Sequence, residues 1–387
     1  MRKPSLSTLD SPLLPLLIIA LAVGIFVFVL LAKSNWHASS FVTAGDKFCD
    51  PNSVPRNLIV RRNSDGYDGQ FYYRLGLDPF TSQRTDYGIT LDMPSLRHQR
   101  ILYPLLSSVL SLGHEPLVPV AMLLINVSAL CLLGWLGGMY AQSLNQHSLW
   151  GILVPLYPGS LLTLTRDLVE LSEINLLFVS LFLLRREKHA TATLVLVLAV
   201  LAKETALIVA AAAALVYVGD RLLKQKPRVK WYYFAAPLAT FCLWQLILAF
   251  IWGNSPVLAG RTLLGIPFKG FIASLWYAFT YQTPLQRRAL PELLFLIAFA
   301  GSVVWCLRST LASPPEVISW CLYGLLVVSL GGAIWSEDWA FLRAATEFSV
   351  IGTIILISSK SKNRIPMATC SLIFWLFLFI RLVRHGD

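Results

Sequence analysis

Long apolar runs separated by short polar segments dominate this chain. The first run, Leu13 to Ala32, leads into a polar stretch from Lys33 to Arg100, and apolar runs then follow one another almost to the end of the sequence. A helix needs about 20 apolar residues to cross a bilayer, whereas barrel strands are shorter and alternate between apolar and polar positions. The pattern therefore predicts an all-α, polytopic transmembrane helical bundle of about 9–11 spans, short half-spans included.

We expect a single integral membrane domain over residues 1–387. Residues 12–32 would form the first span, residues 33–100 an extracytoplasmic loop with interfacial helices, and residues 101–387 the helical bundle. Arg2 and Lys3 precede the first span. Because basic residues favour the cytoplasmic side of a membrane, the N-terminus is expected in the cytoplasm.

The apolar run from Thr191 to Val218 contains a charged break at Lys203-Glu204. As one span, this run would place the basic segment 221–230 outside the cytoplasm and would bury both charges. We therefore predict a hairpin of two half-spans that turns at residues 202–205. The resulting topology brings four polar segments to the outer face, namely residues 65–100, 166–167, 203–204 and 337–343.

Composition supports the membrane class, since 56% of the residues are hydrophobic and only 14% are charged, against about 25% charged residues in soluble domains. The net charge of +11 would suit nucleic acid, but the basic residues cluster at the ends of apolar runs, as topology anchors do, and we expect no nucleic-acid partner. The six cysteines show no CxxC spacing and predict neither a disulfide framework nor a metal site. No cofactor is indicated, and a divalent cation at the acidic residues stays open.

The first loop carries the most unusual segment, Asp65-Gly66-Tyr67-Asp68-Gly69-Gln70-Phe71-Tyr72-Tyr73-Arg74. A carboxylate beside a hydroxyl can act as a general base, and glycine lets the backbone approach a ligand closely. We expect Asp68 to be catalytic, with Asp65 as a second carboxylate, and expect Tyr67, Gln70 and Arg74 to bind substrate. The alternative is a solvated turn, because Asp-Gly pairs mark turns generally.

Arg97, His98 and Arg100 stand at the start of the next apolar run. Their cations could dock a lipid phosphate, or they could simply extend to the membrane interface. Asp167 and Glu170 are three residues apart and share a helix face with Glu173, to which we give less weight. Acids inside apolar runs are functional candidates by default, although Arg166 could merely neutralise Asp167.

Two further sites complete the candidates for substrate or lipid-phosphate binding. Lys203 and Glu204 could form a self-contained ion pair at the hairpin turn, or Lys203 could present its ammonium group to an anionic donor while Glu204 orients it. Arg343 precedes a late apolar run, where a phosphate-binding arginine and an interface anchor would look alike.

Three stretches of this chain resemble the GT-C class of membrane glycosyltransferases, including the GPI-anchor-type mannosyltransferases and related bacterial proteins. They are the loop 67–72, the region from Pro155 to Arg186, and the hairpin turn 201–206, with the segment 341–343 as a weaker fourth. The loop is also similar to a Tyr-Asp-Gly-Gln-Phe-Tyr-Tyr pattern in uncharacterised bacterial membrane proteins. In one respect the chain departs from the class, because many members have two adjacent acids in the loop, whereas Asp65 and Asp68 are three residues apart.

The resemblance implies a GT-C-like fold and the transfer of a sugar from a polyprenyl-phosphate donor to a glycan, lipid or protein acceptor. The transfer would take place on the outer face of the cytoplasmic membrane of a bacterium. Asp68 would be the base, with Asp65 as the alternative, and Arg97, Arg100, Lys203 or Arg343 would hold the lipid phosphate. Two other hypotheses stay open: a multi-pass transporter or lipid flippase, and a non-catalytic subunit of an envelope assembly complex.

Overall fold

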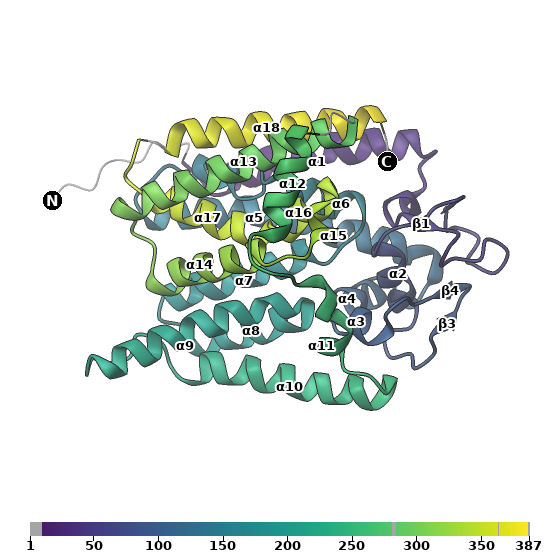
Figure 1. Ribbon diagram of the computed structural model, residues 1–387, viewed down its shortest axis with the longest axis horizontal. Helices are drawn as coiled ribbons and strands as arrows, with labels where there is room; N and C mark the ends of the chain where they lie inside the picture. The colour runs from purple at the N-terminus through teal and green to yellow at the C-terminus, as the bar shows by residue number, and fades with distance from the viewer. Residues whose placement is uncertain (1–9, 281–283, 363, 386–387) are drawn as a thin grey trace. The chain divides into compact units, whose positions relative to one another are not determined.

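The computed structural model describes residues 10–280, 284–362 and 364–385 (Figure 1). This part of the chain is 71% helical and contains almost no strand, which confirms the predicted all-α class. The chain packs as two compact units. Unit 1 comprises residues 1–26, 129–160 and 265–387, and unit 2 comprises residues 27–128 and 161–264.

Unit 1 consists of helices of mostly apolar sequence. It shares α1 (Leu13–Lys33), α5 (Val118–Ser143) and α6 (Pro158–Thr165) with unit 2, and its other elements are η3 (Ser148–Leu153), α12 (Lys269–Thr280), α13 (Pro284–Cys306), η6 (Leu307–Ser309), α14 (Pro314–Val328), α15 (Gly332–Trp335), α16 (Asp338–Ala344), α17 (Thr346–Ser358) and α18 (Arg364–His385). Every residue of α17 is buried, and α13 and α14 pack against it. Ser313 and Glu316 start α14 with a capping box, in which each side chain bonds the backbone N–H of the other residue.

Unit 2 contains a second group of helices. They are α7 (Glu170–Arg185), α8 (His189–Ala202), η4 (Glu204–Ala206), α9 (Leu207–Leu222), α10 (Tyr232–Trp252), α11 (Pro256–Ala259) and η5 (Gly260–Leu263). Helix α8 packs against both α7 and α10, and α10 also packs against α9.

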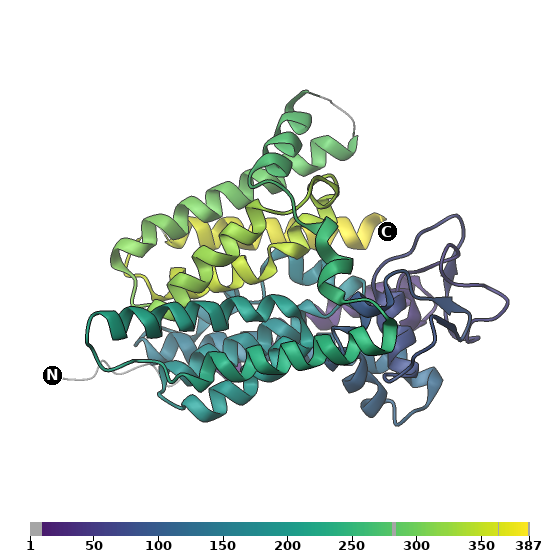
Figure 2. The ribbon, with the colours of Figure 1, turned by 60° about the horizontal axis from the view of Figure 1, so that its bottom comes forward.

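The polar loop of unit 2 and the residues that follow it up to position 117 form short elements at one end of α8 and α10, as both ribbon views show (Figure 2). They are η1 (Ala38–Phe41), β1 (Ala44–Gly45), β2 (Val60–Arg61), α2 (Gly69–Leu77), β3 (Thr85–Asp86), β4 (Ile89–Thr90), α3 (Pro94–His98), α4 (Leu102–Leu110) and η2 (Glu115–Leu117). Strand β1 pairs in parallel with β2, and β3 pairs antiparallel with β4. The sequence does not predict these strands, because two residues are too few to show an alternating pattern.

The predicted hairpin at residues 202–205 is present. Helix α8 ends at Ala202, and α9 begins at Leu207. The first turns of α8 and α10 lie together, because the Ser180 hydroxyl contacts both the Ala192 carbonyl and the Tyr233 hydroxyl, each at 2.8 Å. The ring of Tyr217, late in α9, packs on Phe234, early in α10. Helices α8 and α10 therefore run in parallel and α9 runs against both, so the chain reverses at the charged break.

Six helices of the described residues are long and apolar enough to cross a membrane. They begin at Leu13, Glu115, Glu204, Tyr232, Ala289 and Arg364, and three shorter apolar helices accompany them at His189–Ala202, Pro314–Val328 and Thr346–Ser358. Several apolar helices of this length indicate a multi-pass membrane protein. The span expected at the N-terminal end is among the six. The hairpin was predicted as two half-spans, but only its first helix, His189–Ala202, is short, because the second is long enough to cross a membrane.

Candidate functional site

The glycines of the first loop hold it against the turn between α6 and α7. A Cβ atom on Gly69 would overlap the carbonyl oxygens of Arg166 and Val42, so only glycine fits at the start of α2. Gly66 has a φ of +64° and lies against the backbone of Gly45. These glycines therefore let two backbone segments pack in direct contact, and together they fix the position of Asp68, which lies between them in the sequence.

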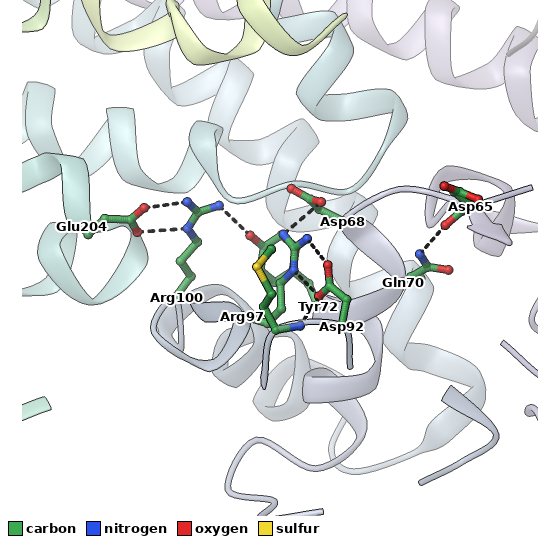
Figure 3. A network of polar contacts seen from close by, with 9 residues as sticks. Asp65, Asp68, Gln70, Tyr72, Asp92, Arg97, Arg100 and Glu204 are labelled. Carbon is green, nitrogen blue, oxygen red and sulfur yellow. Dashed lines mark hydrogen bonds and ion pairs between the residues drawn. The ribbon is translucent and has the colours of Figure 1, made fainter. Parts of the chain in front are cut away.

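Asp68 immediately precedes α2 and points to a buried arginine (Figure 3). Its Oδ1 atom lies 2.9 Å from Nη1 of Arg97, and its side chain is 17% exposed. The same guanidinium group donates two hydrogen bonds to Asp92, from Nε at 2.9 Å and from Nη2 at 2.8 Å, and it lies over the ring of Phe71. Burial disfavours the charge of Arg97, but Asp68 and Asp92 outweigh burial and raise its pKa, so Arg97 is a permanent cation facing Asp68.

Arg100 joins the loop to the tip of the hairpin. Its Nε and Nη2 atoms donate to the carboxylate of Glu204 at 3.0 and 2.6 Å, and its Nη1 atom donates to the Tyr72 hydroxyl at 3.0 Å. Tyr72 lies one helical turn after Asp68, so both side chains occupy one face of α2. Burial alone would lower the pKa of Arg100, but the charge of Glu204 raises it well above its usual value. Arg97 and Arg100 thus present two fixed charges at one face of the loop.

Lys203 faces the acids of α7 from the same hairpin tip. Its Nζ atom lies 3.8 Å from Glu170 and 3.6 Å from Glu173, and all three side chains are at least nine-tenths buried. The Thr205 hydroxyl donates to Glu173 at 2.9 Å. Neighbouring residues of the turn, Lys203 and Glu204, therefore contact different partners, so they do not form the self-contained ion pair considered above.

Asp167 is fully buried in the turn before α7. It has a φ of +47°, a left-handed conformation that Asp tolerates better than most residues. Asn126 approaches Oδ1 at 3.4 Å, while Oδ2 accepts no hydrogen bond from any described residue. Burial raises the pKa of Asp167 well above its usual value. Burial of this kind disfavours the charged form of a carboxyl group.

Tyr67 lies over the same turn. The guanidinium carbon of Arg166 is 5.0 Å from the centre of its ring. Arg166 itself is buried, and its Nη1 atom donates to Thr165 at 3.2 Å. The loop and the 166–167 turn, far apart in the sequence, are therefore joined by side chains as well as by backbone.

Asp65 and Gln70 lie apart from this cluster (Figure 3). The Asp65 carboxylate pairs with Lys47 at 2.7 Å and is 72% exposed. The Gln70 amide accepts from Gly45 N–H and from the Cys49 thiol, and it donates to the Asp65 carbonyl. Gln70 thus holds the loop together through its own side chain.

Arg74 and His98 are also engaged in holding the loop. Arg74 is buried, donates to Thr81 at 3.1 Å and pairs with Asp86 at 3.3 Å. The ring of His98 contacts the Pro79 carbonyl through Nε2 and accepts from Trp252 through Nδ1. Burial lowers the pKa of His98, which agrees with a neutral ring.

Arg343 belongs to unit 1, where it is half-buried in α16. The other candidate residues named from the sequence all belong to unit 2. Of the four polar segments expected to converge, the structure brings together the loop, the 166–167 turn and the hairpin tip.

Asp92 and Tyr72 were not among the candidates named from the sequence, and the structure adds them to the cluster as partners of Arg97 and Arg100. Asp92 precedes Met93-Pro94, where α3 starts, and Arg97 follows one turn into that helix. An acid ahead of a helix with an arginine five residues later is a usable signal. The spacing of Asp68 and Tyr72 by four residues also shows that they share a face once α2 is recognised as a helix.

The carboxylates of this cluster outnumber its cations. Asp68, Asp92, Glu170, Glu173 and Glu204 face Arg97, Arg100 and Lys203, and Arg166 lies nearby. Among the described residues no three His, Cys, Asp or Glu side chains are arranged to hold a metal ion, and all six cysteines are free thiols. An anionic ligand would therefore replace a carboxylate at one of these cations. Comparisons with protein-family models, with curated proteins and with solved structures find no match to this chain.

Proposed function

We propose that this protein is a membrane glycosyltransferase that transfers a sugar from a polyprenyl-phosphate donor to an acceptor, with Asp68 as the general base. One observation carries the proposal: the Asp68 carboxylate is held in place by Arg97 yet keeps access to solvent. A positioned and accessible carboxylate can take the proton of an acceptor hydroxyl. Asp65 lies on the surface with Lys47, so the base is assigned to Asp68 rather than to Asp65.

Arg100 and Lys203 are the proposed partners of the donor phosphate. Each is engaged by carboxylates of unit 2, Arg100 by Glu204 and Lys203 by Glu170 and Glu173. Donor binding would exchange these carboxylates for phosphate oxygens, with no new cation brought in.

The proposed location is the outer face of a bacterial cytoplasmic membrane. The charged cluster lies at the end of α8 where the hairpin turns, whereas the basic residues of 185–188 and 221–230 lie at the other end of these helices. Basic segments prefer the cytoplasmic side, which would place the cluster outside.

Transfer activity tests the proposal directly. Purified protein in lipid nanodiscs would receive radiolabelled polyprenyl-phosphate sugars and an acceptor extract, with Mg²⁺, Mn²⁺ or EDTA in parallel. Replacing Asp68 by Asn should lower the rate by about 10²–10⁴-fold, the usual contribution of a general base. Asp65→Asn is the matched control, and we expect it to stay within about twofold of wild type because its carboxylate is exposed. Absence of turnover with every donor, together with normal complementation by Asp68→Asn in cells, would contradict the proposal.

A second candidate function, transport, is favoured by an ion pair inside unit 1. Glu292 of α13 and Arg381 of α18 pair at 2.9 Å, and both lie within helices that are long and apolar enough to span a membrane. Ionisable groups within spans often belong to substrate or proton pathways. Transport predicts that vesicles containing the protein move a fluorescent lipid-linked sugar between leaflets. It also predicts that Glu292→Gln combined with Arg381→Met, which removes both charges of the pair, stops this movement while Asp68→Asn does not.

A further inference from the structure

A polar depression lies on unit 2, and none of its lining residues belongs to the charged cluster. It encloses about 470 Å³ and is lined by residues 53–57, by Tyr87 and by Glu115-Pro116. Small-molecule sites in proteins commonly measure about 300–1,000 Å³. The depression is therefore large enough for one or two sugar rings.

The walls of this groove are fixed by the backbone. A Cβ atom on Gly88 would lie 2.6 Å from the backbone of Ser53 and Val54, so the tip of the β3–β4 hairpin presses on the opposite wall. The Asp50 N–H donates to the Gly88 carbonyl at 2.8 Å. Such a groove exists before any ligand arrives, which reduces the entropy lost on binding.

Tyr87 has a left-handed backbone conformation, which is unfavourable for a residue with a large side chain. Its φ is +50° and that of Gly88 is +69°, which together make the two-residue turn between β3 and β4. Turns of this kind favour Asn or Asp followed by Gly, and a left-handed residue with a large side chain costs about 1–2 kcal/mol. Strained residues of this sort gather at ligand sites. The guanidinium carbon of Arg74 lies 5.2 Å from the centre of the Tyr87 ring, and Tyr87, which lines the groove, is 37% exposed.

Two charged side chains at the groove are available to a ligand. Arg56 and Glu115 line it, and neither forms an ion pair with any residue that the structure describes. Their formal charges cancel, so the groove does not favour a ligand with a net charge. Both groups are planar and can bond two adjacent hydroxyls at once.

We propose that this groove binds a saccharide, with a sugar ring against Tyr87 and its hydroxyls on Arg56 and Glu115. An aromatic ring beside planar hydrogen-bonding groups of balanced charge suits a neutral, polyhydroxylated ring better than a phosphate or an apolar chain. If the transferase proposal holds, the bound saccharide is part of the acceptor, and this last step rests on that proposal. Saccharide binding itself does not.

Saturation-transfer NMR on the full-length protein in nanodiscs tests the inference without any turnover. The probes are the methyl glycosides of glucose, galactose, mannose and N-acetylglucosamine. Tyr87→Asn supplies the residue that the turn prefers, so it should fold at least as well as wild type while weakening glycoside binding about tenfold. Glu115→Gln should weaken binding about two- to tenfold through loss of a charged acceptor.

Phe80→Ala is the matched control, because Phe80 is a 70% exposed aromatic residue of the same loop that does not line the groove. Its glycoside signal should equal that of wild type. The inference is overturned if no glycoside gives a signal with wild type, or if Tyr87→Asn binds as wild type does. A signal from phosphoethanolamine alone would also overturn it and identify a zwitterion site. Loss of transfer in Asp68→Asn leaves these binding signals unchanged, so the two proposals fail separately.

Discussion

The two units bury charge in different ways. In unit 1, Glu292 and Arg381 pair within apolar helices, Glu292 is wholly enclosed, and the ring of Trp339 covers the guanidinium group at 4.2 Å. In unit 2, the arginines and carboxylates stand at helix ends and turns. There Arg97 contacts two carboxylates, and the paired side chains of Arg100 and Glu204 are 10% and 25% exposed.

This difference separates a fixed ion pair from an exchangeable one. A charged group inside a span has no water to replace a lost partner. Separating such a pair would leave two buried, unsolvated charges, and the high free energy of that state keeps the pair together. Charges at helix ends keep some access to water and have several possible partners. Only the arrangement in unit 2 suits a site where a ligand must displace a carboxylate.

The largest effect is expected in unit 1. Glu292→Gln removes the carboxylate that pairs with the buried Arg381 cation, and removing one partner of a buried pair lowers the free energy of unfolding by about 3–5 kcal/mol. Replacing both residues, as Glu292→Gln with Arg381→Met, should recover most of this loss. The measurement is the labelling rate of Cys306, a fully buried thiol of unit 1, in a background from which the other cysteines have been removed. If Cys306 is labelled at the same rate in the single and the double variant, the pair does not stabilise unit 1 in this way.

A smaller effect is expected when the exchangeable pair is broken. Glu204→Gln leaves Arg100 with Tyr72 and with access to water, so the cost should be about 1.5–3 kcal/mol, the value of hydrogen bonds to a charged group. Cys49 is the matching reporter, because it is fully buried in unit 2 and burial raises its pKa to about 12, which keeps the folded thiol unreactive. Lys47→Ala, which breaks the exposed pair with Asp65, should change this labelling by less than about 1 kcal/mol. If Glu204→Gln lowers the free energy of unfolding as much as Glu292→Gln does, the two ion pairs do not differ as proposed.

The smallest effect concerns pH. Burial lowers the pKa of His98 below its usual 6.5 in the folded protein, so the unfolded chain binds more protons between these two values. Stability should be full above about pH 6.5 and should fall as the pH drops toward the lower, folded value. Tryptophan fluorescence during heating at pH 5.0–8.0 measures this slope. His98→Gln should reduce it, and a slope unchanged in that variant would show that other groups are responsible.

The long apolar runs, and the charges within and between them, were enough to predict the helical membrane class and the reversal at Lys203-Glu204. Both depend on local cost, since a long apolar run excludes water and a charge pair inside such a run is expensive. The same logic located the polar loop and named Asp68, Arg97 and Arg100. It could not separate Asp65 from Asp68, because both are followed by glycine and both suit a turn.

Tertiary packing decided which of these residues meet. Asp68 pairs with Arg97, and the neighbouring Gly69 fits closely against the Arg166 carbonyl, so both contacts join segments that are far apart in the sequence. Three other candidates stabilise the loop through contacts with distant segments. Gln70 bonds Gly45 and Cys49, Arg74 bonds Thr81 and Asp86, and His98 bonds Pro79 and Trp252. The sequence by itself determined where charge is costly along the chain. The fold determined which opposite charges offset that cost, because ion pairs between residues as distant as Arg100 and Glu204 leave no periodic trace in a sequence.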